Sequence, residues 1–192
     1  MVMQHSRTLR SNMLKAWSSV IKTLYDKQRV NSERSLQAAL WSALNARLPD
    51  VNRMFIEPHL KIVGCYTSFV PDIVVCSKFR IAAVIELKYR PCGTAPYSKD
   101  LHTLQTLAQC SKDAFAITNM RFEGKKAGAQ EYRLSPTTLL IWAGIHRPLS
   151  PIAADQRALL CEDYDIPKTR FMQLHAETVR GGRAKVDYLP KL

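Results

Sequence analysis

The chain has 192 residues, of which 46% are hydrophobic and 23% charged, and these values are typical of a globular protein with a core of its own. Its 28 lysines and arginines exceed its 16 aspartates and glutamates, so the formal net charge is +12 at pH 7. This excess favours a polyanionic partner, most commonly nucleic acid, with an anionic membrane surface as the competing explanation. The sequence shows neither an apolar run of the about 18 residues that span a membrane nor a signal-peptide stretch, so we expect no membrane insertion.

The cysteines are typical of a reducing compartment. They are odd in number, contain no Cys-x-x-Cys pair and occupy five positions: Cys65, Cys76, Cys92, Cys110 and Cys161. Three of them lie inside otherwise apolar segments. This pattern favours reduced, partly buried thiols in a cytoplasmic protein over a disulfide framework or a zinc site.

Two amphipathic helices are predicted at the start of the chain. Residues 8–28 place apolar side chains at helical spacing and basic ones, Arg10 among them, on other faces. This pattern predicts a helix that packs on the core and keeps a solvated basic side, which can touch phosphates. Asn31 or Ser32 can cap a second helix over residues 32–48, whose leucines form its main buried stripe.

Residues 54–63 (MFIEPHLKIV) predict the first core strand. Pro58 interrupts this strand, and a proline restricts a strand to an edge or a bulge. Glu57, next to the proline, is therefore interpreted as structural rather than as a ligand.

Residues 68–90 (SFVPDIVVCSKFRIAAVIELKYR) predict two apolar strands joined by a short polar turn. β-Branched runs of this length suit strands that are covered on both faces. If Ser77 pairs with Ile81 across a three-residue loop, Asp72 lies opposite Glu86, with the β-carbons about 5 Å apart.

Charged side chains on these two strands predict a metal-binding site. Glu86 and Lys88 share one face of their strand, because side chains alternate between faces. Two carboxylates as close as Asp72 and Glu86 repel each other unless one holds a proton or a cation lies between them. A hard ion such as Mg²⁺ accepts carboxylate oxygens together with waters and phosphate oxygens. Lys88 would then help to position or deprotonate an attacking water, or neutralise charge on a phosphate. The alternative is a Glu–Lys salt bridge at a strand edge and a turn aspartate.

A helix is predicted over residues 98–112, with Ser98 as its cap. Its first turn contains Asp100, which we interpret as a partner of the helix dipole. Lys99 and Gln105 on the same helix can contact a phosphate or a water.

A basic loop and a last core strand follow this helix. Residues 119–136 predict a mobile loop whose basic side chains include Lys125 and Lys126. This loop is either simply solvated or a flap that clamps a phosphate backbone. Residues 138–145 (TLLIWAGI) predict the last core strand.

Residues from about 150 to 192 are expected to form an appendage. Within them, Gly181-Gly182 suits the two-residue turn of a basic β-hairpin. The hairpin can insert into a groove or pair with a second subunit, and both interpretations stay open.

The motif on the two apolar strands resembles the PD-(D/E)xK nuclease signature of the restriction-endonuclease-like fold. Five residues carry the resemblance: Pro71, Asp72, Glu86, Leu87 and Lys88. The resemblance covers about residues 30–146, but only the stretch from Asp72 to Lys88 matches the family at the level of a sequence motif. It implies an α/β protein with an αβββαβ core, a mixed central sheet, an N-terminal helix and a C-terminal β-hairpin appendage. All of these would belong to one nuclease-like domain over residues 1–192.

The resemblance also implies a Mg²⁺- or Mn²⁺-dependent endonuclease that hydrolyses DNA. Asp72 and Glu86 would bind the ion, and Lys88 would assist the attacking water. Many members of the family carry a glutamate on the helix before the core strands, and Glu33 matches that pattern as a further catalytic and metal-binding residue. The other reading of Glu33 is a favourable partner of the helix dipole. The candidate nucleic-acid contacts are Lys99, Gln105, Lys125 and Lys126.

Two other classes of function stay open at this point. One is a catalytically inactive nuclease-fold protein that binds nucleic acid or a protein partner, and the other is an unrelated basic interaction module in which the motif is accidental. RNA is open as a substrate beside DNA, as are strandedness and specificity. Because one active centre cuts one strand, double-strand cutting would most simply need a homodimer, a step that rests on analogy of fold alone.

Overall fold

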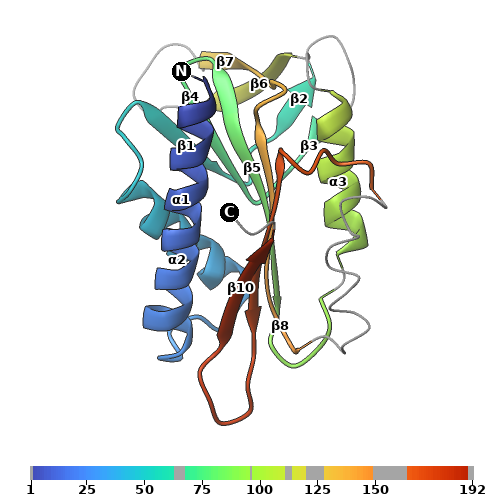
Figure 1. Ribbon diagram of the computed structural model, residues 1–192. Coiled ribbons are helices and arrows are strands. Elements are labelled where there is room, and N and C mark those ends of the chain that lie inside the picture. Colours follow the sequence, from blue (N-terminus) through green and yellow to red (C-terminus); the bar gives the residue numbers. More distant parts are fainter. Residues whose placement is uncertain are drawn as a thin grey trace.

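The computed structural model describes residues 2–62, 68–95, 97–110, 114–119, 128–148 and 164–189. Within these ranges the protein is mixed α/β, with helices on both faces of a central mixed sheet (Figure 1), which is consistent with the restriction-endonuclease-like fold. The helices are α1 (Val2–Val20), its π-helical continuation η1 (Ile21–Tyr25), α2 (Glu33–Asn45) and α3 (Ser98–Gln109). The strands are β1 (Asn52–Ile56), β2 (Leu60–Ile62), β3 (Ser68–Phe69), β4 (Ile73–Ser77), β5 (Arg80–Arg90), β6 (Ala114–Asn119), β7 (Gly128–Arg133), β8 (Leu139–His146), β9 (Phe171–Glu177) and β10 (Lys185–Leu189).

The long strand β5 lies at the centre of the sheet. The strands follow the order β10-β9-β8-β5-β7-β6-β2-β3, while β4 pairs with β5 and β1 pairs with β4. Strands β5, β8 and β9 run parallel, whereas β1, β4 and β5 form an antiparallel meander. The predicted order of helix, three strands, helix and strand is confirmed as α2, β1, β4, β5, α3 and β8.

Two hydrophobic cores lie on the two faces of this sheet. Helices α1 and α2 cover one face and α3 covers the other (Figure 1). Ile85 and Leu87 of β5 belong to the core under α1 and α2, in which Trp17 is fully buried, while Val84 belongs with Leu104 of α3 to the other core. The alternation along β5 therefore directs Glu86 and Lys88 toward the α3 face.

Both N-terminal helices are confirmed, with one correction. Ser32 is the N-cap of α2 and forms a capping box with Ser35. Arg10, however, does not lie on a solvated basic side: it is buried and donates hydrogen bonds to the carbonyl oxygens of Thr169 (2.6 Å) and Phe171 (3.3 Å). The start of β9 lies beneath α1, and its carbonyl groups attract the guanidinium. On α3 the N-cap is Tyr97, without a side-chain cap, and Ser98 is the first helical residue.

Two predicted segments are divided differently in the structure. Residues 54–63 form two strands instead of one, because the chain turns at Glu57, which has a φ of +45°. Strand β1 then pairs with β4, and β2 pairs with β3 and β6. The predicted loop over residues 119–136 contains β7, which pairs with β6. Lys125 and Lys126 lie outside the described residues.

The predicted C-terminal hairpin is present and forms part of the central sheet. Strand β10 pairs with β9, and every residue of β9 is buried because β9 also pairs in parallel with β8. The connection spans residues 178–184 rather than two glycines. It turns at Gly181, which has a φ of +69°, and at Gly182, whose N–H donates to the carbonyl oxygen of Val179 (3.1 Å).

The described cysteines form no disulfide. Cys76 is buried, Cys110 half-buried and Cys92 exposed, while Cys65 and Cys161 lie outside the described residues. Among the helices of the described ranges, none has the length and apolarity needed to cross a bilayer.

Candidate active site

The predicted pairing of β4 with β5 holds near Asp72, although the turn differs from the expected one. Ser77 pairs with Arg80, not with Ile81, so the turn has two residues. A β-bulge between Val75 and Cys76 then shifts the register by one residue. Because the bulge offsets the shorter turn, the strands return to the predicted register.

The ladder ends at the pair of Ile73 with Ile85, so Asp72, which comes directly before β4, lies at the level of Glu86. Strand β5 continues beyond that pair, and its edge toward β4 no longer has a strand partner. The N–H groups of Leu87 and Tyr89 point toward this edge, because N–H groups two residues apart face the same side of a strand.

Two predicted carboxylates replace the missing strand at this edge. The Leu87 N–H donates to Oδ2 of Asp72 (2.5 Å), and the Tyr89 N–H donates to Oε2 of Glu33 (3.1 Å). Buried backbone donors are costly when unpaired, so each carboxylate satisfies a requirement of the sheet. The structure therefore brings Glu33 of α2 to the same strand end as Asp72.

The backbone of Asp72 is held from two further sides. Its carbonyl oxygen accepts hydrogen bonds from Nε2 of Gln37 and from the N–H of Glu57, both at 2.9 Å. Gln37 is buried on α2, and Glu57 occupies the left-handed turn between β1 and β2. Neither residue was predicted to serve the site, and this backbone support explains why the turn at Glu57 is maintained.

Lys88 forms ion pairs with two carboxylates. Its Nζ lies 3.2 Å from Oδ2 of Asp100 and 3.9 Å from Oε2 of Glu33. Asp100 is only 7% exposed and also accepts a hydrogen bond from Nε1 of Trp142 (3.3 Å). Asp100 is therefore a site residue, and its interpretation as a dipole partner alone was incomplete.

A signal for Asp100 exists in the sequence. Asp100, Leu104 and Leu107 follow the i, i+4, i+7 spacing of one helical face, and all three are buried. An acidic residue at the start of an apolar stripe is directed toward the sheet, as Glu33 is before Leu36 on α2.

The charges of the site shift the pKa values of its members. Burial, followed by the charges of Asp72 and Asp100, raises the pKa of Glu86 to about 9. Burial also raises the pKa of Asp72 to about 6, against the hydrogen bond from the Leu87 N–H. Burial lowers the pKa of Lys88, but the charges of Asp100 and Glu33 outweigh it, and the result lies above the usual value. Lys88 is therefore a permanent cation near neutral pH.

The carboxylates of Asp72 and Glu86 fit a hard divalent ion. Within the described part of the chain, Glu86 is 8% exposed and has no hydrogen-bond or ion-pair partner. A buried carboxylate without such a partner can be compensated by a proton or by a bound cation. Among the described residues, however, no three His, Cys, Asp or Glu side chains converge as one ligand set. The side-chain ligands for an ion are thus Asp72 and Glu86, because Oε2 of Glu33 already contacts the Tyr89 N–H and the Lys88 ammonium.

The predicted nucleic-acid contacts differ in their distance from the carboxylates. Lys99 is exposed in the first turn of α3, and its charge lowers the pKa of Glu86, which places it near the site. Gln105 is half-buried about 9 Å further along the helix axis, by the rise of 1.5 Å per residue. Lys125 and Lys126 lie outside the described ranges.

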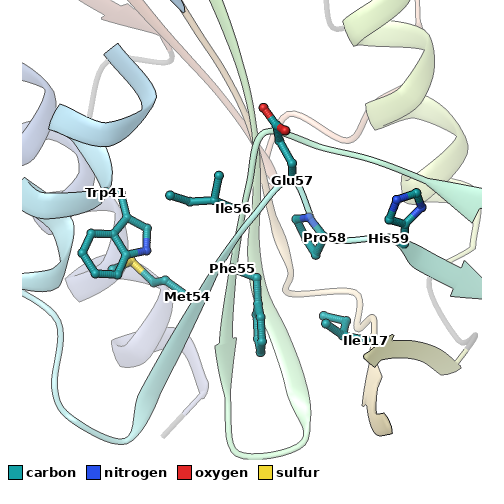
Figure 2. A pocket seen from close by; sticks show the side chains of 8 residues that line it. All are labelled: Trp41, Met54, Phe55, Ile56, Glu57, Pro58, His59 and Ile117. Atoms are coloured by element: carbon teal, nitrogen blue, oxygen red, sulfur yellow. The ribbon is translucent and has the colours of Figure 1, made fainter. Parts of the chain in front are cut away.

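A groove of about 650 Å³ is lined in part by the turn at Glu57, whose N–H donates to the carbonyl oxygen of Asp72. Its lining is mostly apolar and comes from α2, from β1 and the turn after it, and from β6. Figure 2 shows the Glu57 carboxylate pointing away from the other lining side chains. The groove contains none of the predicted catalytic residues, and the Asp72–Glu86 pair lies outside it.

Glu86 is expected to make the metal-free protein less stable as the pH rises. Its pKa is 4.5 in a model peptide and about 9 in the folded protein, so between these values the unfolded chain releases a proton that the folded protein keeps. The contribution of Glu86 to the free energy of unfolding is fully present below the lower value. It falls by up to about 1.4 kcal/mol per pH unit between the two values. Glu86→Gln removes this dependence, whereas Glu131→Gln, at an exposed position, keeps it.

Urea unfolding in the presence of a chelator tests this expectation. The pH series runs from about 6.5 to 8.5, which lies above the pKa of Asp72. An equally steep pH dependence in Glu86→Gln would show that Glu86 is not the group responsible.

Comparison with known proteins gives one weak structural likeness. No protein-family profile matches the sequence, and no curated protein matches it. The chain is similar to a solved structure of NucC from E. coli MS115-1 in its cAAA-bound form, with 11% sequence identity and a TM-score of 0.45. The likeness covers 98% of this chain and 83% of the NucC chain. A TM-score this low carries no conclusion about function, which has to be argued from the side chains themselves.

Proposed function

We propose that the protein is a metal-dependent nuclease that hydrolyses phosphodiester bonds of DNA, with Asp72 and Glu86 holding Mg²⁺ or Mn²⁺. One observation carries this proposal: the half-buried carboxylate of Asp72 and the buried carboxylate of Glu86 lie at the same level of the β4–β5 pair, where burial raises the pKa of both and the charge of Lys88 lowers it. An arrangement that concentrates negative charge in a buried place has a cost, which a bound cation removes.

The donor set suits the proposed ion. Mg²⁺ is usually held by one or two carboxylates and completes its shell with waters and phosphate oxygens. When bound, such an ion polarises a phosphoryl oxygen and makes a bound water more acidic. Two side-chain carboxylates are therefore sufficient to hold the ion. Glu33 is proposed to bind the Tyr89 N–H at the edge of β5 and the Lys88 ammonium instead.

Lys88 is assigned the role of a fixed positive charge. The carboxylates of Asp100 and Glu33 keep it protonated, so it does not serve as the base that deprotonates water. A preorganised cation stabilises the negative charge that develops on the phosphate during hydrolysis. Of the two roles that the sequence left open for Lys88, charge neutralisation is the one that its ion pairs support.

The basic surface supports a nucleic-acid substrate. With a net charge of +12, we expect affinity for DNA that depends on salt and little on sequence. Lys99, near Glu86, is proposed to contact a phosphate beside the scissile bond, and Gln105, Lys125 and Lys126 are proposed to contact the substrate further away. A homodimer is proposed only for cutting both strands, since the described residues of one chain form one such site.

The direct test is a cleavage panel. The purified protein is incubated with supercoiled, linear and single-stranded DNA and with RNA, each with Mg²⁺, Mn²⁺ or a chelator. We expect DNA cleavage with either metal and none with the chelator. Binding of DNA without cleavage under every condition would favour the inactive binding protein instead.

Lys99→Gln is expected to weaken DNA binding several-fold at low salt and to reduce the slope of log affinity against log salt by about 1, because one phosphate contact is lost. Lys27→Gln removes the same charge at an exposed position just after η1 and serves as the control. Fluorescence-anisotropy titrations over a salt series measure both slopes. Equal slopes in the two variants would remove Lys99 from the interface.

A further inference from the structure

We propose that Asp100, anchored by Trp142, is a positioning residue that holds the Lys88 ammonium away from the Asp72–Glu86 pair and so keeps that pair available for a cation. The inference rests on the proposed function, because it concerns the same site. It gives Asp100 a role in metal affinity although Asp100 need not touch the ion.

The ion pairs of Lys88 are the first observation. Lys88 lies two residues after Glu86 on the same face of β5, within reach of its carboxylate. In the described part of the chain, its ion pairs nevertheless run to Asp100 and Glu33 and not to Asp72 or Glu86. The contact with Asp100 is the shorter of the two, at 3.2 Å, and involves the more buried partner.

The anchoring of Asp100 is the second observation. Its Oδ2 accepts hydrogen bonds from the Lys88 ammonium and from the Trp142 indole N–H, so the carboxylate is fixed between a strand side chain and a neighbouring strand. Trp142 lies next to Glu86 in the β5–β8 ladder and is 2% exposed. Charge-assisted hydrogen bonds of this kind hold a carboxylate more firmly than a single contact does.

The Trp142 ring is itself fixed by its neighbours. Gly144 lies beside Lys88 in the ladder, and a Cβ there would meet the Trp142 ring, with Cζ2 at 2.9 Å. Tyr97 packs edge-on against the indole at a centroid distance of 6.3 Å, and His175 lies 5.3 Å from it. The glycine thus admits the ring, and the aromatic neighbours define where its N–H points.

Loss of the Asp100 charge should release Lys88 toward the metal-binding pair. Glu33 is a weak alternative anchor, because it lies 3.9 Å away and its side chain is 44% exposed. A lysine has a flexible four-carbon stem, and a released ammonium is attracted to the nearest carboxylates. Lys88 would then compete with the cation for Asp72 and Glu86.

A double-mutant cycle in metal binding tests the inference. Asp100→Asn should weaken Mn²⁺ binding about tenfold in the parent protein. In a Lys88→Met background the same substitution should change it less than about threefold, because no ammonium remains to compete. Asp50→Asn removes an equal charge from an exposed loop and should leave Mn²⁺ affinity unchanged. Calorimetric titration of metal-free protein with MnCl₂ gives the dissociation constants, and urea unfolding confirms that each variant is folded.

Turnover gives a second, independent readout. Asp100→Asn should lower kcat about ten- to a hundredfold at saturating Mn²⁺ and leave the KM for DNA unchanged, since the lysine is displaced while the basic surface is intact. Trp142→Phe keeps the ring but loses the N–H, and it should act in the same direction with little added effect in the Asp100→Asn protein.

The outcomes separate this inference from the proposed function. A parent protein that neither binds Mn²⁺ nor cleaves DNA would overturn both. A parent that does both, with Asp100→Asn weakening Mn²⁺ binding equally with and without Lys88, would overturn the positioning role alone. Should Asp100→Asn fail to fold, Trp142→Phe with unchanged Mn²⁺ affinity and kcat would overturn it as well.

Discussion

Asp72→Asn is expected to lower DNA cleavage about a thousandfold or more and to weaken Mn²⁺ binding, while the metal-free fold stays at least as stable. The substitution removes one of two ligating charges, and a loss of about 4 kcal/mol of transition-state stabilisation corresponds to this factor. The fold is spared because the amide oxygen of asparagine can still accept the Leu87 N–H. Its neutral side chain also ends the repulsion with Glu86, whose pKa the Asp72 charge raises.

Three measurements on the same preparation check this expectation: plasmid cleavage, calorimetric Mn²⁺ titration and urea unfolding with a chelator. The protein with Asp50→Asn carries the same change in net charge and serves as the control. A variant that binds Mn²⁺ as tightly as the parent and still cuts would show that the active centre lies elsewhere.

Lys88→Met is expected to lower turnover by about 10² to 10³, the usual cost of removing a preorganised charge from a transition state. Methionine keeps much of the aliphatic stem of a side chain that is only 19% exposed, so packing is largely retained. Mn²⁺ binding should persist or become tighter, because a positive charge beside the ion is lost. The two variants thus separate cation binding from the chemical step.

Single-turnover cleavage with saturating Mn²⁺ measures the effect without a contribution from product release. Lys99→Gln is a useful comparison, because it should act on DNA affinity and not on the cleavage step. If Lys88→Met cleaved at the rate of the parent, Lys88 would be a structural partner of Asp100 and nothing more.

The hairpin of β4 and β5 shows how a sequence prediction can be correct in the position of its strands and wrong in the detail of its turn. Alternation and β-branched content predicted both strands and the level of Asp72 opposite Glu86, and the pairing of Ile73 with Ile85 confirms that level. The two-residue turn and the bulge after Val75 were not predicted. The apolar pattern sets the register of the buried residues. A two-residue turn with a bulge and a three-residue loop give the same register beyond the bulge, so the pattern does not distinguish them.

Contacts made across the sequence were the part that could not be predicted. Helical periodicity makes Arg10 a candidate for solvent, and the spacing of Asp100 with Leu104 and Leu107 marks a buried face but does not identify the partner of the carboxylate. Their partners, Lys88 and the carbonyl groups at the start of β9, belong to segments far away in the chain. Only the assembled sheet shows that these charges are compensated inside the protein.

The contacts between α1 and β9 have a consequence for the order of folding during synthesis. Arg10 and Trp17 leave the ribosome long before the residues whose carbonyl groups they bind, Thr169, Phe171 and His175, at separations of 158 to 161 residues. Until β9 emerges, the apolar stripe of the first helix lacks part of its cover, and strand β8 lacks its outer neighbour. Such non-local contacts slow folding and leave a nascent chain open to aggregation. We therefore expect interrupted chains that end before β9 to be both insoluble and inactive, so that the proposed activity would require β9 to have been synthesised.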